Sequence, residues 1–244
     1  MSSYREASPV ILTAHGSVDP RSAEVSHAIA DQIRRLRPGL DVRVAFCENS
    51  TPNLRDVLAE LRGPAIVAPL LLASAYHARI DIPAIVDESD AGRRGDVLQT
   101  DTLGEDRRLV ALLHRRLADV GVEPHHRDAG VVITAVGSSH ARANAATATL
   151  GPALARGTAW AGVRVAFATT QPSVSDAIEE LRHTGIKRIA LAPWFIAPGR
   201  ITDRVAAVAA AADVAVAEPL GAHPLLAATV LDRVDRALAA RRVA

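Results

Sequence analysis

The sequence predicts an α/β protein built from two similar open domains, each a parallel sheet covered by helices. Short apolar runs rich in valine and isoleucine alternate with longer amphipathic stretches, which is the order of β–α–β units. Of the 244 residues 49% are hydrophobic but only 3% are aromatic, so we expect a core of Ala, Val, Leu and Ile. The pattern of the first half also returns in the second half.

The opening strand of the first half ends directly before a histidine. Residues 10–14 are apolar and mostly β-branched, as in a buried parallel strand, and His15, Gly16 and Ser17 follow. A residue just past the carboxyl end of such a strand points into the crevice where α/β sheets bind ligands. The further strands that we expect in this half cover residues 41–46, 65–72 and 97–100.

Capping residues and helical spacing mark the helices of the first half. Asp19 with Pro20 suits a helix start, and Thr51 with Pro52 is predicted to start the next helix. Apolar residues then recur on one face of each helix. These faces hold Val25, Ile29, Ile33 and Leu36, then Leu54, Val57, Leu58 and Leu61, and in a third helix ending near Gly121 they hold Leu109, Leu112, Leu113 and Leu117.

The second half repeats the first. Residues 163–168 echo residues 42–47, and residues 189–196 match the strand expected over residues 65–72. Repeats of this length indicate duplicated domains rather than solenoid units. We expect them to be residues 1–122 and 123–244, facing each other across a central cleft. The remaining elements predicted in the second half are a strand over residues 129–135 and a final helix over about residues 224–241.

Three polar residues of the first half have no counterpart in the second. His15, Glu48 and His77 each follow the carboxyl end of a different expected strand, so they can converge at one edge of a sheet. Val136 stands at the place of His15, Thr169 falls near that of Glu48, and no histidine matches His77. Because the fold tolerates the loss of all three groups, we assign them to a functional site.

Two imidazoles and a carboxylate suit a divalent first-row metal such as Fe(II), Co(II), Ni(II) or Zn(II). His15, Glu48 and His77 come from three separate loops, unlike the compact ligand spacing of a structural zinc finger. The sequence therefore predicts an open site, in which the metal is a substrate or a catalyst.

Asp81, four residues after His77, has two open interpretations. If the segment is helical, its carboxylate can accept a hydrogen bond from the His77 ring and orient it. The alternative is that Asp81 caps the helix that contains Pro83.

Positive charge and hydroxyl groups follow the same strand ends. Arg79 comes just after His77, and Arg200 and Arg204 lie in the matching loop of the second half. With Ser17, Ser138 and backbone N–H groups at helix starts, they can bind the carboxylates of a ligand.

Composition excludes several classes of protein. The net charge of +1 provides no general attraction to nucleic acid or to an anionic membrane surface. Cys47 is the only cysteine, which excludes a disulfide framework and a cysteine-based metal site. The polar N-terminus and the absence of a long uncharged apolar run favour a soluble, cytoplasmic protein. As a separate expectation, the protein is a monomer or a homodimer.

These motifs resemble one known family. Thr-Ala-His15-Gly-Ser, Phe46-Cys-Glu48, and Pro-Leu-Leu-Leu-Ala-Ser-Ala-Tyr-His77 with Asp81-Ile-Pro83 look like the class II chelatases. The closer resemblance is to their sirohydrochlorin chelatase branch, and it spans both halves because that family is itself a duplicated α/β fold.

The resemblance implies an activity and a role for each site residue. It implies that His15 and His77 bind the metal, that Glu48 assists, and that the metal is a substrate rather than a permanently bound cofactor. The expected reaction is insertion of Fe(II) into sirohydrochlorin for siroheme, with Co(II) insertion for cobalamin as the alternative. The residues expected at the carboxylate-bearing rim of the tetrapyrrole are Ser17, Ser138, Arg79 and Arg200.

Two functions of other classes are compared with this one. A metal or tetrapyrrole carrier without catalysis would use the same ligands. A phosphoryl-transfer enzyme with His15 as nucleophile is disfavoured, because Ala14 precedes the histidine and no arginine cluster surrounds it to hold a phosphate.

Overall fold

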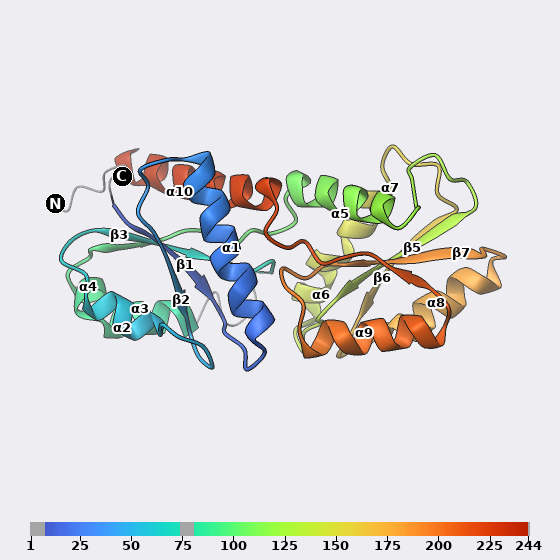
Figure 1. Ribbon diagram of the computed structural model, residues 1–244, viewed down its shortest axis with the longest axis horizontal. Coiled ribbons are helices and arrows are strands. Elements are labelled where there is room, and N and C mark those ends of the chain that lie inside the picture. Colours follow the sequence, from blue (N-terminus) through green and yellow to red (C-terminus); the bar gives the residue numbers. More distant parts are fainter. Residues whose placement is uncertain (1–7, 74–80, 244) are drawn as a thin grey trace. The chain divides into compact units, whose positions relative to one another are not determined.

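The computed structural model describes residues 8–73 and 81–243, which form two compact units (Figure 1). Unit 1 comprises Met1–Gly104 with Ala222–Ala244, and unit 2 comprises Glu105–Gly221. Each unit contains one four-stranded sheet in which every strand pair is parallel. The predicted fold class, two similar parallel-sheet α/β domains, is therefore confirmed.

The sheet of unit 1 has the strand order β2-β1-β3-β4. Its strands are β1 (Val10–Ala14), β2 (Val42–Phe46), β3 (Ala65–Pro69) and β4 (Val97–Gln99). The central strand β1 is buried along its whole length, as its apolar sequence predicts. Because all pairs are parallel, the segments that follow β1, β2 and β3 leave from the same edge of the sheet.

Helices cover both faces of this sheet (Figure 1). They are α1 (Pro20–Leu36), α2 (Leu54–Ala59), α3 (Ile82–Glu88), α4 (Asp90–Arg93) and α10 (Pro224–Val243). One face packs against the apolar sides of α2, α3 and α4, with Ile11, Ala45 and Val67 in the shared core. The other face is covered by α1 and α10, which also pack on each other.

The two predicted helix starts of this unit have different outcomes. The Asp19 carboxylate accepts a hydrogen bond from the Arg21 N–H with Pro20 in the first turn, as predicted for α1. The second helix begins at Leu54 after an Asn53 cap, not at Thr51-Pro52. The Pro52 carbonyl accepts a 2.9 Å hydrogen bond from the Phe46 N–H at the end of β2. This bond holds Pro52 beside the strand, outside the helix.

Unit 2 has the same topology, with strand order β6-β5-β7-β8. Its strands are β5 (Ala129–Ala135), β6 (Gly162–Phe167), β7 (Arg188–Pro193) and β8 (Ala215–Val216). Its helices are α5 (Arg107–Asp119), α6 (Ala141–Ala148), α7 (Leu150–Ala155), α8 (Val174–His183) and α9 (Arg200–Ala211). The expected strands over residues 65–72 and 189–196 both end earlier, at the proline where pairing with the central strand stops.

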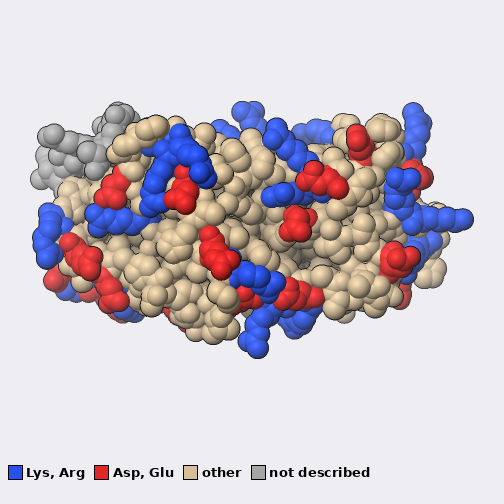
Figure 2. All heavy atoms as spheres, in the orientation of Figure 1, with Lys and Arg blue, Asp and Glu red and all other residues tan. Residues whose placement is uncertain are grey.

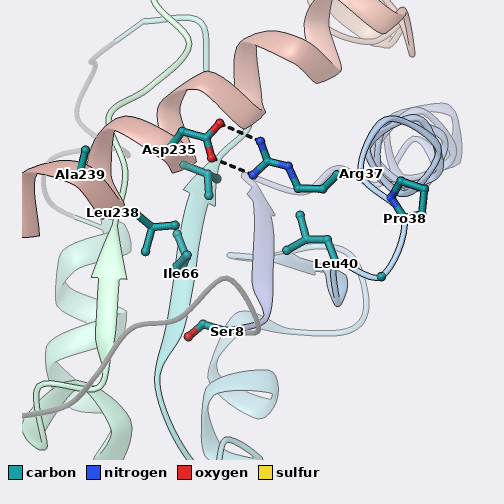
Figure 3. A pocket seen from close by; sticks show the side chains of 10 residues that line it. Ser8, Arg37, Pro38, Leu40, Ile66, Asp235, Leu238 and Ala239 are labelled. Atoms are coloured by element: carbon teal, nitrogen blue, oxygen red, sulfur yellow. Dashed lines mark hydrogen bonds and ion pairs between the residues drawn. The ribbon is translucent and has the colours of Figure 1, made fainter. Parts of the chain in front are cut away.

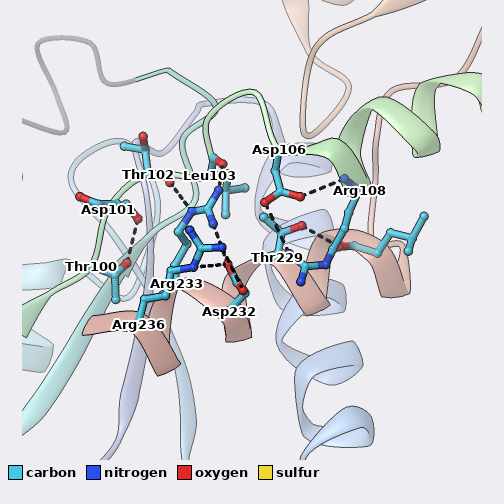
Figure 4. Close-up of polar contacts among 11 residues, drawn as sticks. Thr100, Asp101, Thr102, Leu103, Asp106, Arg108, Thr229, Asp232, Arg233 and Arg236 are labelled. Carbon is cyan, nitrogen blue, oxygen red and sulfur yellow. Dashed lines mark hydrogen bonds and ion pairs between the residues drawn. The ribbon is translucent and has the colours of Figure 1, made fainter. Parts of the chain in front are cut away.

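The compact units differ from the expected domains 1–122 and 123–244 because the last helix of each half packs on the sheet of the other half. The helix α5 lies against β7 and α7, whereas α10 lies against α1 and β3. Arg233 of α10 donates to the carbonyl oxygens of Thr102 (3.0 Å) and Leu103 (2.6 Å), as Figure 4 shows. The cleft expected between the domains stays a prediction.

Basic and acidic side chains are interspersed on the face seen in Figure 2. Within residues 8–73 and 81–243, no helix combines the length and apolar character that crossing a membrane requires.

Candidate active site

His15 and Glu48 meet at the carboxyl edge of the first sheet. The parallel pairing of β1 and β2 continues past both strands, since the Cys47 N–H donates to the Ala14 carbonyl and the Glu48 N–H to the His15 carbonyl, both at 3.0 Å. The His15 Nε2 lies 2.9 Å from the Glu48 Oε1. The two side chains are 39% and 55% exposed, so both are open to a ligand.

Gly16 allows the two loops to approach this closely. Its φ of +97° lies in the left-handed region, and a Cβ built on it would stand 1.7 Å from the Glu48 carbonyl oxygen. Ser50 ties the loops together from the other side. Its Oγ accepts from the Ser17 N–H (3.1 Å) and donates to the Ser17 carbonyl (2.9 Å). The backbone around His15 and Glu48 is thus fixed by packing and by hydrogen bonds.

The same backbone in unit 2 carries no such pair. Gly137 has a φ of +92°, and the Thr169 N–H donates to the Val136 carbonyl at 3.0 Å. Val136 and Thr169 therefore occupy the places of His15 and Glu48, which confirms the comparison drawn from the sequence. The Thr169 hydroxyl also donates to the Val136 carbonyl, a contact local to the loop.

One local difference between the loops lies next to Glu48. The loop from Phe46 to Pro52 is one residue longer than the loop from Phe167 to Pro172. In the longer loop Asn49 takes a left-handed conformation, with φ 57°, and its Nδ2 donates to the Glu48 Oε1 at 2.9 Å. The Asn49 amide and the His15 ring thus contact the same carboxylate oxygen. Sequence reasoning missed Asn49.

A cavity of about 390 Å³ opens beside this pair. The residues of its wall that bear on function are His15, Cys47, Glu48, Arg55, Asp81 and Ile85. Asp81 stands at the N-cap position of α3, as the capping interpretation expects, but its side chain makes no capping hydrogen bond there, and the residue also lines the cavity. Its predicted contact with His77 involves a residue outside the described ranges and stays a prediction. Arg55 was not among the predicted site residues.

The thiol of Cys47 also lines this cavity. Burial, and then the negative charges of Asp81 and Glu48, raise its pKa to about 11. A thiol binds metal as the thiolate, and so high a pKa keeps it protonated at neutral pH. The other candidate metal donors of this cavity are the His15 imidazole and the carboxylates of Glu48 and Asp81.

The other predicted site residues are not among the described residues that line this cavity. His77 and Arg79 lie outside the described residues. The hydroxyls of Ser17 and Ser138 each accept a hydrogen bond from the backbone N–H two residues on, at 3.0 and 3.1 Å, so both help to shape their loops. Arg200 is exposed at the first position of α9. In the described ranges 8–73 and 81–243, no three His, Cys, Asp or Glu side chains gather closely enough to hold a metal ion.

A larger hollow of unit 1 lies at the opposite end of the strands. It has a volume of about 740 Å³ and includes Ser8 and Leu40, which stand before β1 and β2 (Figure 3). At its rim Arg37 and Asp235 form two hydrogen bonds of 2.7 Å with each other. Ligands of open α/β sheets bind at the carboxyl edge, so the cavity beside His15 is the better candidate despite its smaller volume.

The fold and the site together define a class: a duplicated α/β protein with a histidine–carboxylate site at the carboxyl edge of only one of its two sheets. The model of the CbiX family matches residues 9–120 and 130–237. The chain therefore belongs to the CbiX family, and the resemblance to sirohydrochlorin chelatases is confirmed.

Individual relatives agree with this assignment, and one solved structure has a similar fold. The chain is 30% identical over 122 residues to a sirohydrochlorin cobaltochelatase of Methanosarcina barkeri, covering 45% of this chain and 94% of the relative. It is 25% identical over 205 residues to a sirohydrochlorin ferrochelatase of Priestia megaterium, covering 80% and 76%. The fold is similar to SirB from Bacillus subtilis with Fe3+, with a TM-score of 0.82, 21% identity and 97% of each chain covered.

Proposed function

We propose that this protein inserts a divalent metal ion into sirohydrochlorin, with Fe2+ as the first candidate and Co2+ as the alternative. The observation that carries the proposal is the 2.9 Å approach of the His15 Nε2 to the Glu48 Oε1 at an open sheet edge. Membership of the CbiX family and the names of the relatives support the substrate.

The spacing of the His15 and Glu48 donor atoms suits metal binding, and their exposure suits metal release. Metal–nitrogen and metal–oxygen bonds are about 2.0–2.2 Å long, so two donors 2.9 Å apart can bind one ion side by side. Both side chains are partly exposed, which allows the ion to arrive with water and to leave toward the macrocycle. A buried, fully enclosed donor set would instead retain the metal.

Insertion also requires two protons to leave the pyrrole nitrogens. An imidazole with a pKa near neutral can accept such a proton, and a carboxylate beside it stabilises the imidazolium that forms. In this proposal the His15 Nε2 alternates between the metal and a proton, while the Glu48 carboxylate completes the metal site and stabilises the imidazolium once the ion has left. His77 supplies the second imidazole, an assignment that rests on the resemblance of its motif.

Binding of the macrocycle needs positive charge and hydrogen-bond donors, because sirohydrochlorin carries carboxylate arms. Ser17, Ser138, Arg79 and Arg200 are proposed for this rim. The hydroxyls of Ser17 and Ser138 already accept hydrogen bonds from their own loops, but each hydroxyl keeps a proton to donate to a carboxylate.

The choice between iron and cobalt is not made by the donor atoms. Imidazole and carboxylate ligands accept both ions, and availability decides as much as affinity. The relatives include both a cobaltochelatase and a ferrochelatase, which leaves both metals as candidates for this chain.

The test is anaerobic incubation of the purified protein with sirohydrochlorin and either Fe2+ or Co2+, followed by absorbance. We expect insertion faster than in the protein-free reaction with at least one metal, and the ratio of the two rates identifies the preferred ion. If neither metal is inserted faster than in the protein-free reaction, the proposal is wrong. Tight binding of sirohydrochlorin without faster insertion would instead indicate a tetrapyrrole carrier that does not catalyse the reaction.

A further inference from the structure

Arg55 is a charged residue of the active-site cavity to which no role has been assigned. It lies in the first turn of α2 and lines the cavity together with His15 and Glu48. Among the described residues of the cavity wall it is the one arginine or lysine, while Glu48 and Asp81 are acidic. A cation at the margin of an acidic metal-handling cavity is placed to bind the anionic groups of a ligand.

The present partner of Arg55 is easily replaced. Its guanidinium forms an ion pair with Glu88 at the end of α3, and the two side chains are 54% and 61% exposed. Ion pairs that are this exposed contribute little to stability, because water and salt screen them. A carboxylate of a bound substrate can therefore take the place of Glu88 at low cost.

A second hollow extends from the same arginine. It has a volume of about 230 Å³ and shares Arg55 and Ile85 with the cavity at His15. Its wall also carries Glu88, together with Arg93, which is paired with Asp90. Arg55 thus lines both hollows, one of which is the cavity that His15 and Glu48 line.

Comparison of the two halves supports a functional role for Arg55. The helices α2 and α8 follow matching strands and are matching elements, with Leu54 at the place of Val174. The next residue is Arg55 in α2 and Ser175 in α8. The arginine, like His15 and Glu48, is present only in the half that carries the site, so the helix does not need it to fold.

We propose that Arg55 binds a carboxylate arm of the tetrapyrrole substrate and exchanges Glu88 for that carboxylate when the substrate binds. The planar guanidinium can donate two parallel hydrogen bonds to one carboxylate, which fixes the direction of the arm as well as its position. Arg55 is then a positioning residue for the macrocycle and does not contact the metal. This inference rests on the proposed function.

The experiment measures binding of metal-free sirohydrochlorin by its fluorescence, together with the affinity for Co2+ in a separate titration. We expect Arg55→Gln to raise the Kd for sirohydrochlorin about tenfold, which is the loss of one charge-assisted hydrogen-bonded pair. Arg55→Lys keeps the charge without the planar fork and should recover part of this loss. The affinity for Co2+ should stay within about twofold of wild type in both variants.

Two matched variants control for charge. Glu88→Gln frees Arg55 from its competitor and should tighten sirohydrochlorin binding. Arg43→Gln removes a partly exposed arginine of the edge strand β2, which is paired with Asp41, and should leave binding unchanged. Raising the salt concentration should weaken binding to wild type more steeply than binding to Arg55→Gln.

The outcomes separate this inference from the proposed function. If wild type accelerates insertion but Arg55→Gln binds sirohydrochlorin like wild type, the role of Arg55 is overturned and the chelatase activity remains. An equal loss of Co2+ and sirohydrochlorin affinity in Arg55→Gln also overturns it, because the residue would then support the whole site. If wild type does not accelerate insertion, the proposed function fails, whatever Arg55 does.

Discussion

Arg116 and Arg233 stand at matching positions on the last helices of the two halves, and each binds the backbone of the other half. The Arg116 Nη2 donates to the Leu220 carbonyl at 3.1 Å, and the Arg233 Nη2 donates to the Leu103 carbonyl at 2.6 Å. Leu220 and Leu103 stand at matching places before the two helices. Each compact unit is therefore completed by a helix from the opposite half of the sequence.

Replacing Arg233 should destabilise the protein through α10. Its side chain is only 12% exposed and also donates to the Thr102 carbonyl and to Asp232. We expect Arg233→Met to lower the free energy of unfolding by about 2 kcal/mol, because the apolar stem is kept but the charged hydrogen bonds are lost. Urea denaturation followed by circular dichroism measures this change.

Arg236 is the matched control for this prediction. It lies one turn further on α10, also pairs with Asp232, and is 69% exposed. Arg236→Met should change the free energy of unfolding by less than about 0.5 kcal/mol. Equal effects of the two substitutions would contradict the anchoring role of Arg233.

A methyl group at Gly16 should disrupt the active site. Its Cβ would overlap the Glu48 carbonyl, so the loops that carry His15 and Glu48 must move apart. We expect Gly16→Ala to abolish measurable insertion and to destabilise the fold by more than about 2 kcal/mol. Gly39→Ala provides the comparison, since Gly39 has a φ of +88° but no atom within 4 Å of its Cβ position.

The Gly39 variant isolates backbone strain from the clash. It should cost about 1–2 kcal/mol, the usual cost of a left-handed conformation for alanine, and it should keep the full rate of insertion. If Gly16→Ala behaves like Gly39→Ala in the insertion assay, the close approach of the two loops is not required for activity.

His114 should make the stability of the protein depend on pH. Burial lowers the pKa of His114, a hydrogen bond with the Leu154 backbone opposes this in part, and the ring stacks on Trp160 at a centroid distance of 5.3 Å. The folded state then prefers the neutral ring. Below about pH 6.5 this histidine becomes protonated in the unfolded chain before it does so in the folded protein. The stabilisation that is present above about pH 6.5 is therefore lost as the pH falls toward the lower pKa of the folded state.

Replacement of the ring should remove this contribution. His114→Phe keeps an aromatic partner for Trp160 but cannot titrate, so its urea midpoint should fall less than that of wild type between about pH 7.5 and about pH 5.5. The same fall for His114→Phe as for wild type would contradict a lowered pKa.

Most of the fold could be predicted from the sequence because its signals are local and repeated. The buried strand over residues 10–14 and the capped start at Asp19 are correct, and the strand over residues 129–135 is correct to the residue. The pairing of the last helices could not be predicted. Both α5 and α10 bury apolar residues, but their sequences do not indicate which of the two sheets each helix covers; the three-dimensional path of the chain decides this.

The candidate site was predictable where the duplication provides a comparison. Val136 and Thr169 indicated that His15 and Glu48 are dispensable for folding, and the structure brings the latter two into contact. Arg55 was missed because it lies on a helix rather than directly after a strand, although Ser175 at the matching position was a usable signal. The extra residue beside Glu48 was also visible as a change in spacing between the two repeats.

The roles of His15 and Glu48 lead to a prediction about metal binding. If both donors bind one ion, His15→Asn and Glu48→Gln should each weaken Co2+ binding by at least about tenfold, as judged by anaerobic calorimetric titration. The double variant should be weaker than either single variant but by less than the sum of the two effects, because the donors contact the same ion. Thr169→Val alters the residue that matches Glu48 in unit 2 and should bind Co2+ like wild type. Additive losses from His15 and Glu48 would place the two side chains at separate sites, whereas an unchanged affinity of Glu48→Gln would limit the carboxylate to orienting the His15 ring.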